Sequence, residues 1–195
     1  MLVRLSAMAG WLLILALAGG GGCARCPLPP APTAAALKPG HYVRDFYAAP
    51  GLRPEQLSCT LAPFAVEEAT GLAAEDFSAL LEEELAKAWA ANGLKTTGPG
   101  PPCSLSGVVH QVALSGRQLR FLTGQISAQL AVSGAITQNG EVLFAFRDCL
   151  TLDSPVSPGP PAPMESKLLL RHLSRAFAHR LLNQLLLHGA TADSE

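Results

Sequence analysis

The stretch QISAQLAVSGAITQNGEVLFAFRDCLTL, residues 125–152, decides the fold of this chain. Apolar and polar residues alternate on both sides of Asn139-Gly140, as they do in half-buried β-strands. Asn-Gly is typical of a two-residue hairpin turn, because both central residues of a type I′ turn need a positive φ. The stretch therefore predicts an antiparallel hairpin in which Ser133 lies on the face directed to solvent or to a partner. The opposite, buried face is expected to carry Ile126, Leu130, Val132, Val142, Phe144 and Phe146.

Two amphipathic helices are predicted, one on each side of this hairpin in the sequence. Residues 72–91 place apolar side chains at helical spacing, and Asn92-Gly93 supplies a C-terminal stop. Residues 165–188 repeat the pattern, with Gly189 expected to end the helix. The buried stripes are Phe77, Leu80, Leu81, Leu85, Ala88 and Trp89 in the first helix, and Leu169, Leu173, Ala176, Phe177, Leu181 and Leu185 in the second.

The remaining elements complete a strand, helix, three strands, helix order. Residues 57–64 and 103–114 alternate as strands, and the Pro-rich residues 153–163 form a loop. Residues 41–47 could form a short edge strand, but we favour aromatic side chains docked on the domain. The simplest architecture that buries both helical stripes is an α+β fold, an antiparallel sheet of about four strands with two helices packed on one face.

The composition excludes several classes of protein. The chain has 195 residues, 49% of them hydrophobic and 15% charged, with a formal net charge of −1. Such a chain is hydrophobic enough to fold and carries no basic footprint for nucleic acid.

The N-terminus predicts export. Arg4 precedes an apolar run over residues 7–18, which is shorter than the roughly 20 residues that span a bilayer. We therefore interpret residues 1–22 as a signal peptide. Four glycines lead into Cys23, an arrangement that resembles the lipobox in which cysteine becomes the lipidated first residue of the mature protein. A cut after Ala18, which ends a small-x-small site, is the alternative.

The rest of the chain divides into three parts. Residues 23–40 combine the lipidated cysteine with a Pro-rich tether, residues 41–188 form a single domain, and residues 189–195 form a flexible tail.

Four cysteines remain after Cys23, namely Cys26, Cys59, Cys103 and Cys149. We expect one disulfide among Cys59, Cys103 and Cys149, and the alternative is that these cysteines are small buried hydrophobic residues.

The sequence contains no motif for catalysis, a cofactor or a metal, so we expect a protein that is not an enzyme. Lys167, Arg171 and Arg175 recur every four residues and form a basic stripe on the last helix. The stripe is a candidate contact for a partner or for acidic lipid headgroups, although solvated helix faces commonly look the same.

The leader ending in Cys23, the Pro-rich segment, the element order and the QNGE turn together resemble the PqiC-like auxiliary lipoproteins of ABC-type lipid-transport systems and related envelope lipoproteins. This resemblance implies a lipid-anchored component that contacts other envelope proteins. Ala24 after the cysteine implies sorting to the outer membrane, facing the periplasm.

We therefore expect a non-catalytic envelope lipoprotein, an auxiliary or assembly component of a transport system. One alternative is a periplasmic carrier of lipid or lipopolysaccharide, and another is a secreted enzyme without a recognisable motif.

Overall fold

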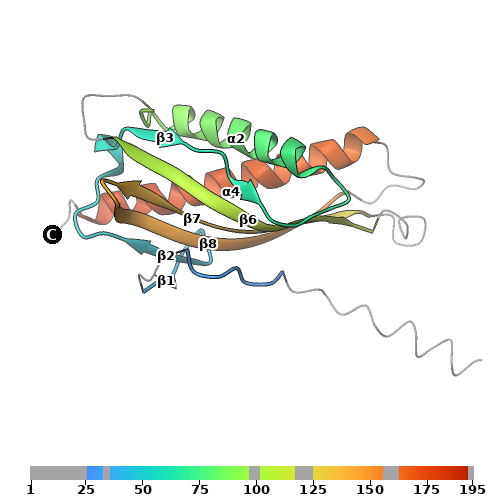
Figure 1. Cartoon of the computed structure of the whole chain (residues 1–195), viewed down its shortest axis with the longest axis horizontal. Coiled ribbons are helices and arrows are strands. Elements are labelled where there is room, and N and C mark those ends of the chain that lie inside the picture. Colours follow the sequence, from blue (N-terminus) through green and yellow to red (C-terminus); the bar gives the residue numbers. More distant parts are fainter. Residues whose placement is uncertain (1–25, 33–35, 97–101, 117–124, 156–162, 193–195) are drawn as a thin grey trace, which may run out of the picture.

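The computed structural model describes residues 26–32, 36–96, 102–116, 125–155 and 163–192, so the predicted leader, Cys23 and residues 193–195 lie outside the described residues (Figure 1). In chain order the elements are β1 (Lys38–Pro39), β2 (Asp45–Ala48), the 3-10 turn η2 (Pro54–Gln56), β3 (Cys59–Leu61), β4 (Ala65–Val66), β5 (Ala69–Thr70), α2 (Ala74–Ala91), β6 (Cys103–Ser115), β7 (Ser127–Gln138), β8 (Glu141–Asp153) and α4 (Pro163–Ala192).

The predicted hairpin is confirmed as β7 and β8, which pair antiparallel from Gln138 and Glu141 onward. Asn139 and Gly140 have φ of 51° and 84°, as a type I′ turn requires. A register shift between Ile136 and Thr137 corrects one detail. It places Val142 opposite Thr137 and lets Leu143 pack against the core, so the expected inward position of Val142 is wrong.

The α+β class is confirmed, but over the described residues the sheet is mixed and has eight strands rather than about four antiparallel ones. The main path runs β1-β2-β8-β7-β6-β3, and β4 and β5 also pair with β6. The three short strands β3, β4 and β5 run parallel to β6. The reason is the connection: the chain passes through α2 before it returns as β6, and a helical crossover joins parallel strands.

The other sheet edge also differs from the prediction. Residues 45–48 form the strand β2 on β8, so docking of aromatics alone is wrong for this segment. The pairing is reinforced where Arg147 Nε donates to Asp45 Oδ2 over 2.7 Å. Phe46 from this strand is buried against the Phe144 ring, 6.0 Å away between centroids.

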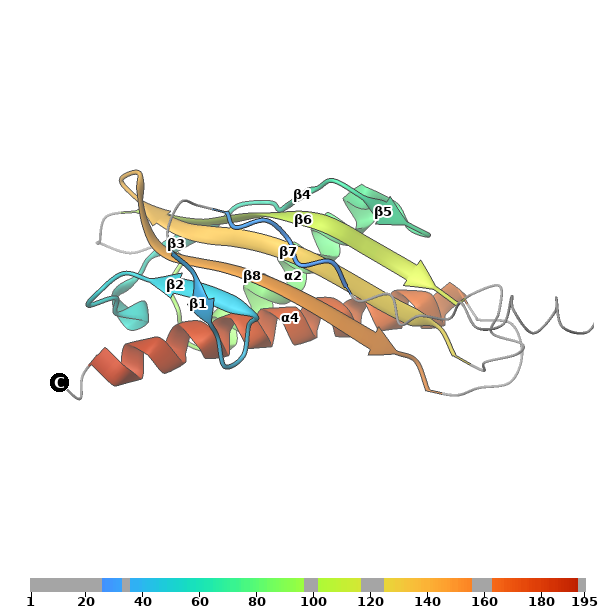
Figure 2. The ribbon, with the colours of Figure 1, turned by 90° about the horizontal axis from the view of Figure 1, so that it is seen from below.

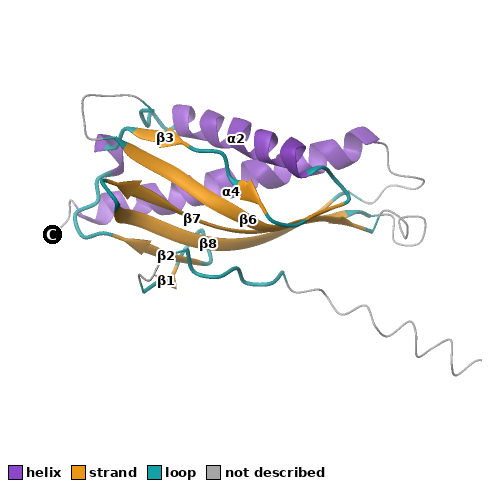
Figure 3. Cartoon of the chain, viewed as in Figure 1, coloured by secondary structure: helices purple, strands orange, loops and turns teal. Residues whose placement is uncertain are grey.

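Both predicted helices are present (Figure 3). α2 ends as expected, because Gly93 follows it with a φ of 69°. α4 runs beyond the predicted 165–188 at both ends and passes through Gly189. One interior glycine destabilises a helix by only about 1 kcal/mol. Gly189 therefore does not end α4, because helix-favouring alanines follow at positions 190 and 192.

One hydrophobic core lies between the sheet and the two helices (Figure 2). Phe144 and Phe146 project from β8 into this core, and Phe177 from α4 meets Phe146 at 5.8 Å between ring centroids. Gly134 in β7 makes room for the Phe146 ring, since a Cβ at this position would come within 2.8 Å of Cζ. The face of the sheet that packs on the helices is called the inner face below, and the opposite one the outer face.

Candidate functional site

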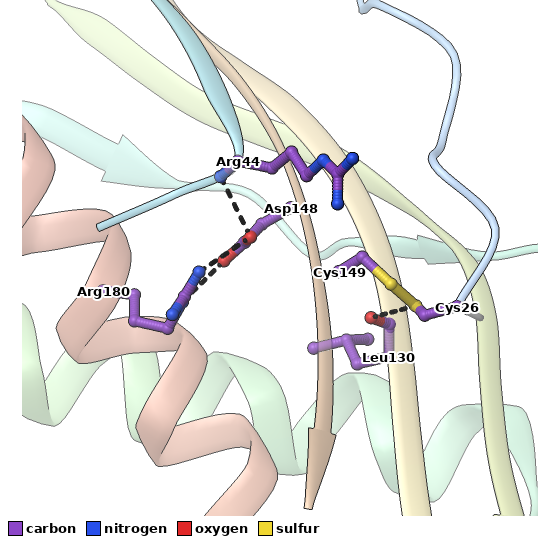
Figure 4. Close-up of a disulfide and its surroundings, with 6 residues drawn as sticks. All are labelled: Cys26, Arg44, Leu130, Asp148, Cys149 and Arg180. Atoms are coloured by element: carbon purple, nitrogen blue, oxygen red, sulfur yellow. Dashed lines mark hydrogen bonds and ion pairs between the residues drawn. A yellow bond between two sulfur atoms is a disulfide. The ribbon is translucent and has the colours of Figure 1, made fainter. Parts of the chain in front are cut away.

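The N-terminal segment, residues 26–32, lies on the outer face of the sheet (Figure 4). Cys26 forms a disulfide with Cys149 of β8, with the two Cα atoms 6.0 Å apart. The Sγ of Cys26 lies 3.3 Å from the carbonyl oxygen of Leu130, and Arg147 Nη1 donates to the carbonyl of Pro29 at 3.4 Å. Pro29 is buried. This part of the predicted tether is therefore attached to the domain and not a solvated spacer.

Asp148, the neighbour of Cys149, points the other way, into the space between sheet and α4 (Figure 4). Its carboxylate is fully buried and accepts hydrogen bonds from Arg180 Nε and Nη2, at 2.8 and 3.1 Å. The backbone N–H of Arg44 donates to the same carboxylate at 3.1 Å. These charge-assisted bonds compensate for the burial of the charge and join β8, α4 and the start of β2.

The second disulfide joins Cys59 of β3 to Cys103 of β6, at positions that face each other in the parallel pair. Their Cα atoms are 4.4 Å apart. Of the three cysteines predicted to share one bridge, two are thus bonded to each other, and Cys149 is bonded to Cys26. The sequence analysis assigned Cys26 to the tether and so did not predict its bond to β8. The one signal for a second disulfide was that an even number of cysteines, four, remains after Cys23.

The basic stripe on α4 faces acidic residues of α2. Arg175 Nε donates to Glu84 Oε2 at 2.9 Å, and Arg171 lies 3.7 Å from both Glu83 and Glu84. Burial favours a higher pKa for Glu84, but hydrogen bonds from Arg175 and Lys87 outweigh it and lower the pKa. Arg171 and Arg175 are therefore engaged within the domain.

A cavity of about 430 Å³ lies between α2 and α4, where α4 begins. Lys167 and Arg171 of the predicted stripe line it, beside Asp76 and Glu83. Its apolar walls come from Leu72, Phe77, Leu80, Leu114 and Leu170. Within the described part of the chain, the buried Ser166 Oγ and Arg171 Nε lack hydrogen-bond partners, and both residues line this cavity. The cavity thus offers apolar surface together with donors that a polar group could satisfy.

A cluster of Glu67, His110 and Ser133 lies on the outer face of the sheet, and the sequence analysis did not predict it. His110 Nδ1 is 2.7 Å from Glu67 Oε2, and His110 Nε2 is 2.8 Å from Ser133 Oγ. His110 is the extra residue of a register shift between Val109 and Gln111, and alternation alone does not reveal such a shift.

The cluster has the nucleophile, base and acid order of a serine hydrolase. However, Ser133 lies in the middle of β7 and is only 3% exposed, so this serine is almost completely shielded from solvent. Ser133 lies on the outer face as predicted, but it is buried there, and its Oγ is hydrogen-bonded to the His110 ring.

Among the described residues, no helix is both long and apolar enough to cross a membrane. In the same residues, no group of three or more His, Cys, Asp or Glu side chains is arranged to hold a metal ion.

No protein-family model matches the chain, and no curated protein matches it significantly. Solved structures with a similar arrangement include rare lipoprotein B from Shewanella oneidensis, at 14% identity and a TM-score of 0.44, covering 66% of this chain and 98% of that one. A minor lipoprotein from Acinetobacter baumannii is 16% identical with a TM-score of 0.44, covering 64% and 94%. A PelC dodecamer from Paraburkholderia phytofirmans is 15% identical with a TM-score of 0.45, covering 72% and 94%. These likenesses are too distant to assign the chain to a family.

Proposed function

We propose that this chain is an exported, lipid-anchored, non-catalytic component of a bacterial envelope. The observation that carries the proposal is the pairing of four cysteines into two disulfides, Cys26–Cys149 and Cys59–Cys103. Disulfides persist in the periplasm and are reduced in the cytosol, so both bridges fit a chain that has left the cytosol. The apolar leader ending in Cys23 supplies the export signal.

The same pairing supports Cys23 as the lipidated residue. With four of the five cysteines joined to one another, Cys23 is the fifth and stands directly behind the small residues of the leader. Acylation gives this cysteine a role in an oxidising compartment, where an odd thiol would otherwise be open to exchange.

The non-catalytic part of the proposal draws on the Glu67, His110 and Ser133 cluster. The serine of this cluster is buried within the sheet, and none of the three residues lines the cavity between α2 and α4.

We propose that the domain contacts other envelope proteins. It would do so as an auxiliary or assembly component of a transport system in the outer membrane.

A second candidate is a carrier of lipid, and the cavity between α2 and α4 favours it. Its volume of about 430 Å³ lies within the usual range of small-molecule sites. Leucine walls suit an acyl chain, and Lys167, an exposed residue of the lining, suits an anionic headgroup. A fluorescent fatty acid should bind the protein, and Leu80→Arg, which places a charge among these walls, should weaken the binding more than tenfold.

The lead proposal is tested by metabolic labelling with a radioactive fatty acid. The wild type should be labelled and Cys23→Ser should not, while Cys26→Ser should keep its label and serve as the control. Equal labelling of the wild type and Cys23→Ser would contradict the proposed anchor, as would a mature chain beginning after Ala18.

A further inference from the structure

The direction of the N-terminal segment shows where an anchor would leave the domain. Cys26 is bonded to Cys149, whereas Pro29, further along the chain, meets Arg147. The segment therefore runs opposite to β8. From Pro29 back to Cys26 the segment points toward the end of β8 at Asp153, and Figures 1 and 2 show that α4 begins at this same end of the molecule.

The disulfide also limits how far the anchor can lie from Cys26. Cys23 precedes Cys26 by three residues, which span at most about 10 Å when extended. Without the disulfide, the 15 residues from Cys23 to β1 at Lys38 could extend about 50 Å. The Cys26–Cys149 bridge therefore leaves only a short stretch of chain between Cys23 and the domain.

Two apolar side chains and a cation are exposed at this end, where α4 begins. Met164 is 72% exposed and Leu168 is 48% exposed, and their spacing of four places them on the same side of α4. Lys167 is exposed beside them. Arg171 and Arg175, in contrast, are held against α2 by ion pairs with Glu84. At the opposite end of α4, Leu187 is also exposed, at 42%, roughly 30 Å away along the helix.

We propose that the first two turns of α4 rest on an anionic lipid bilayer, with Met164 and Leu168 among the headgroups and Lys167 paired with a lipid phosphate. This inference rests on the proposed lipidation of Cys23. A bilayer suits the surface because apolar side chains next to a lysine are typical of helices that lie on membranes. The anchor then fixes the orientation of the whole domain, with the hairpin end directed away from the membrane.

The test uses the full mature protein in vesicles of phosphatidylcholine and phosphatidylglycerol that contain brominated lipid, which quenches tryptophan at short range. Leu168→Trp and Leu187→Trp are matched variants, since both positions are exposed on one helix. Trp89 is only 1% exposed and supplies the baseline. We expect the added fluorescence to be quenched at least threefold more at position 168 than at 187. Equal quenching at the two positions, or stronger quenching at 187, would overturn the inference.

Two further measurements separate the causes. In a Cys26→Ala, Cys149→Ala background, the ratio of quenching at position 168 to quenching at position 187 should fall toward one, because a longer stretch of chain then separates the anchor from the domain. An unchanged ratio would contradict the role of the disulfide. The intact mass of the mature chain reports lipidation independently. Preferential quenching at 168 without the lipid mass would refute the proposed anchor and support the surface, whereas the lipid mass with equal quenching would refute the surface alone.

Discussion

Asp148 and Cys149 are consecutive residues of β8 whose side chains leave opposite faces of the sheet and join it to different parts of the chain (Figure 4). Asp148 binds Arg180 of α4 on the inner face, and Cys149 is bonded to Cys26 on the outer face. The alternation of side chains along a strand makes this arrangement possible. One dipeptide thus holds the helix layer and the N-terminal segment on the same strand.

Removing the Cys26–Cys149 bridge should destabilise the domain. The chain between the two cysteines spans 123 residues, against 44 for Cys59–Cys103. The loop-entropy model assigns about 4 kcal/mol to the shorter of these loops and about 1 kcal/mol more to the longer. Urea denaturation of the two double alanine variants measures both losses. A negligible loss for Cys26→Ala, Cys149→Ala would mean that the N-terminal segment is not held on the sheet.

The two arginines of the α4 stripe should differ. Arg175→Gln removes the 2.9 Å hydrogen bond to the buried Glu84 carboxylate, so we expect a loss of about 1.5–3 kcal/mol in the free energy of unfolding. Arg171→Gln should cost about 0.5 kcal/mol or less, since its guanidinium lies 3.7 Å from the glutamates. Chemical denaturation at neutral pH should rank them in this order. If Arg171→Gln costs as much as Arg175→Gln, the pairing with α2 is not as described.

Phe144 and Ser133 test the register of the hairpin. Phe144 is fully buried on the inner face, and Phe144→Ala should cost about 3–5 kcal/mol. The alternation of the sequence predicts that Ser133→Ala is nearly neutral, but the 2.8 Å contact with His110 Nε2 changes this expectation to a loss of about 1 kcal/mol. Denaturation that ranks Ser133→Ala as the more damaging change would indicate that the strand is shifted by one residue.

His188 should make the stability depend on pH. Burial, with a smaller contribution from Lys38, lowers the pKa of this histidine in the folded protein. A lowered pKa means that the folded state favours the neutral ring. The stabilisation is therefore complete above the unfolded pKa of about 6.5 and is lost as the pH falls through the folded value. Thermal unfolding between pH 7 and 5 should show a decline that His188→Gln reduces; an identical slope in both proteins would contradict it.

Local patterns predicted the parts of the fold that depend on neighbouring residues. The Asn139-Gly140 turn needs only two residues with positive φ, and the α2 stripe needs only helical spacing. The parts of the fold that were not predicted depend on partners far apart in the sequence. β4 and β5 have two residues each and are too short to show a period, and the parallel direction of β3, β4 and β5 is set by the crossover through α2.

The candidate site was predicted less completely, for the same reason. The extra residue at His110 has no local signature, so its meeting with Glu67 and Ser133 could not be anticipated. The stripe of Lys167, Arg171 and Arg175 was visible, but the acidic face that neutralises part of it belongs to α2. Cys26 looked like part of a tether because proline-rich segments are usually extended and solvated.

The measurement that tests the central claim most directly is mass spectrometry of the mature protein isolated from membranes, intact and after digestion without reduction. The account predicts a chain that begins at an acylated Cys23, together with a disulfide-linked peptide pair containing Cys26 and Cys149. A chain that begins at Gly19 with an unmodified Cys23, or a Cys26 found as a free thiol, would contradict it.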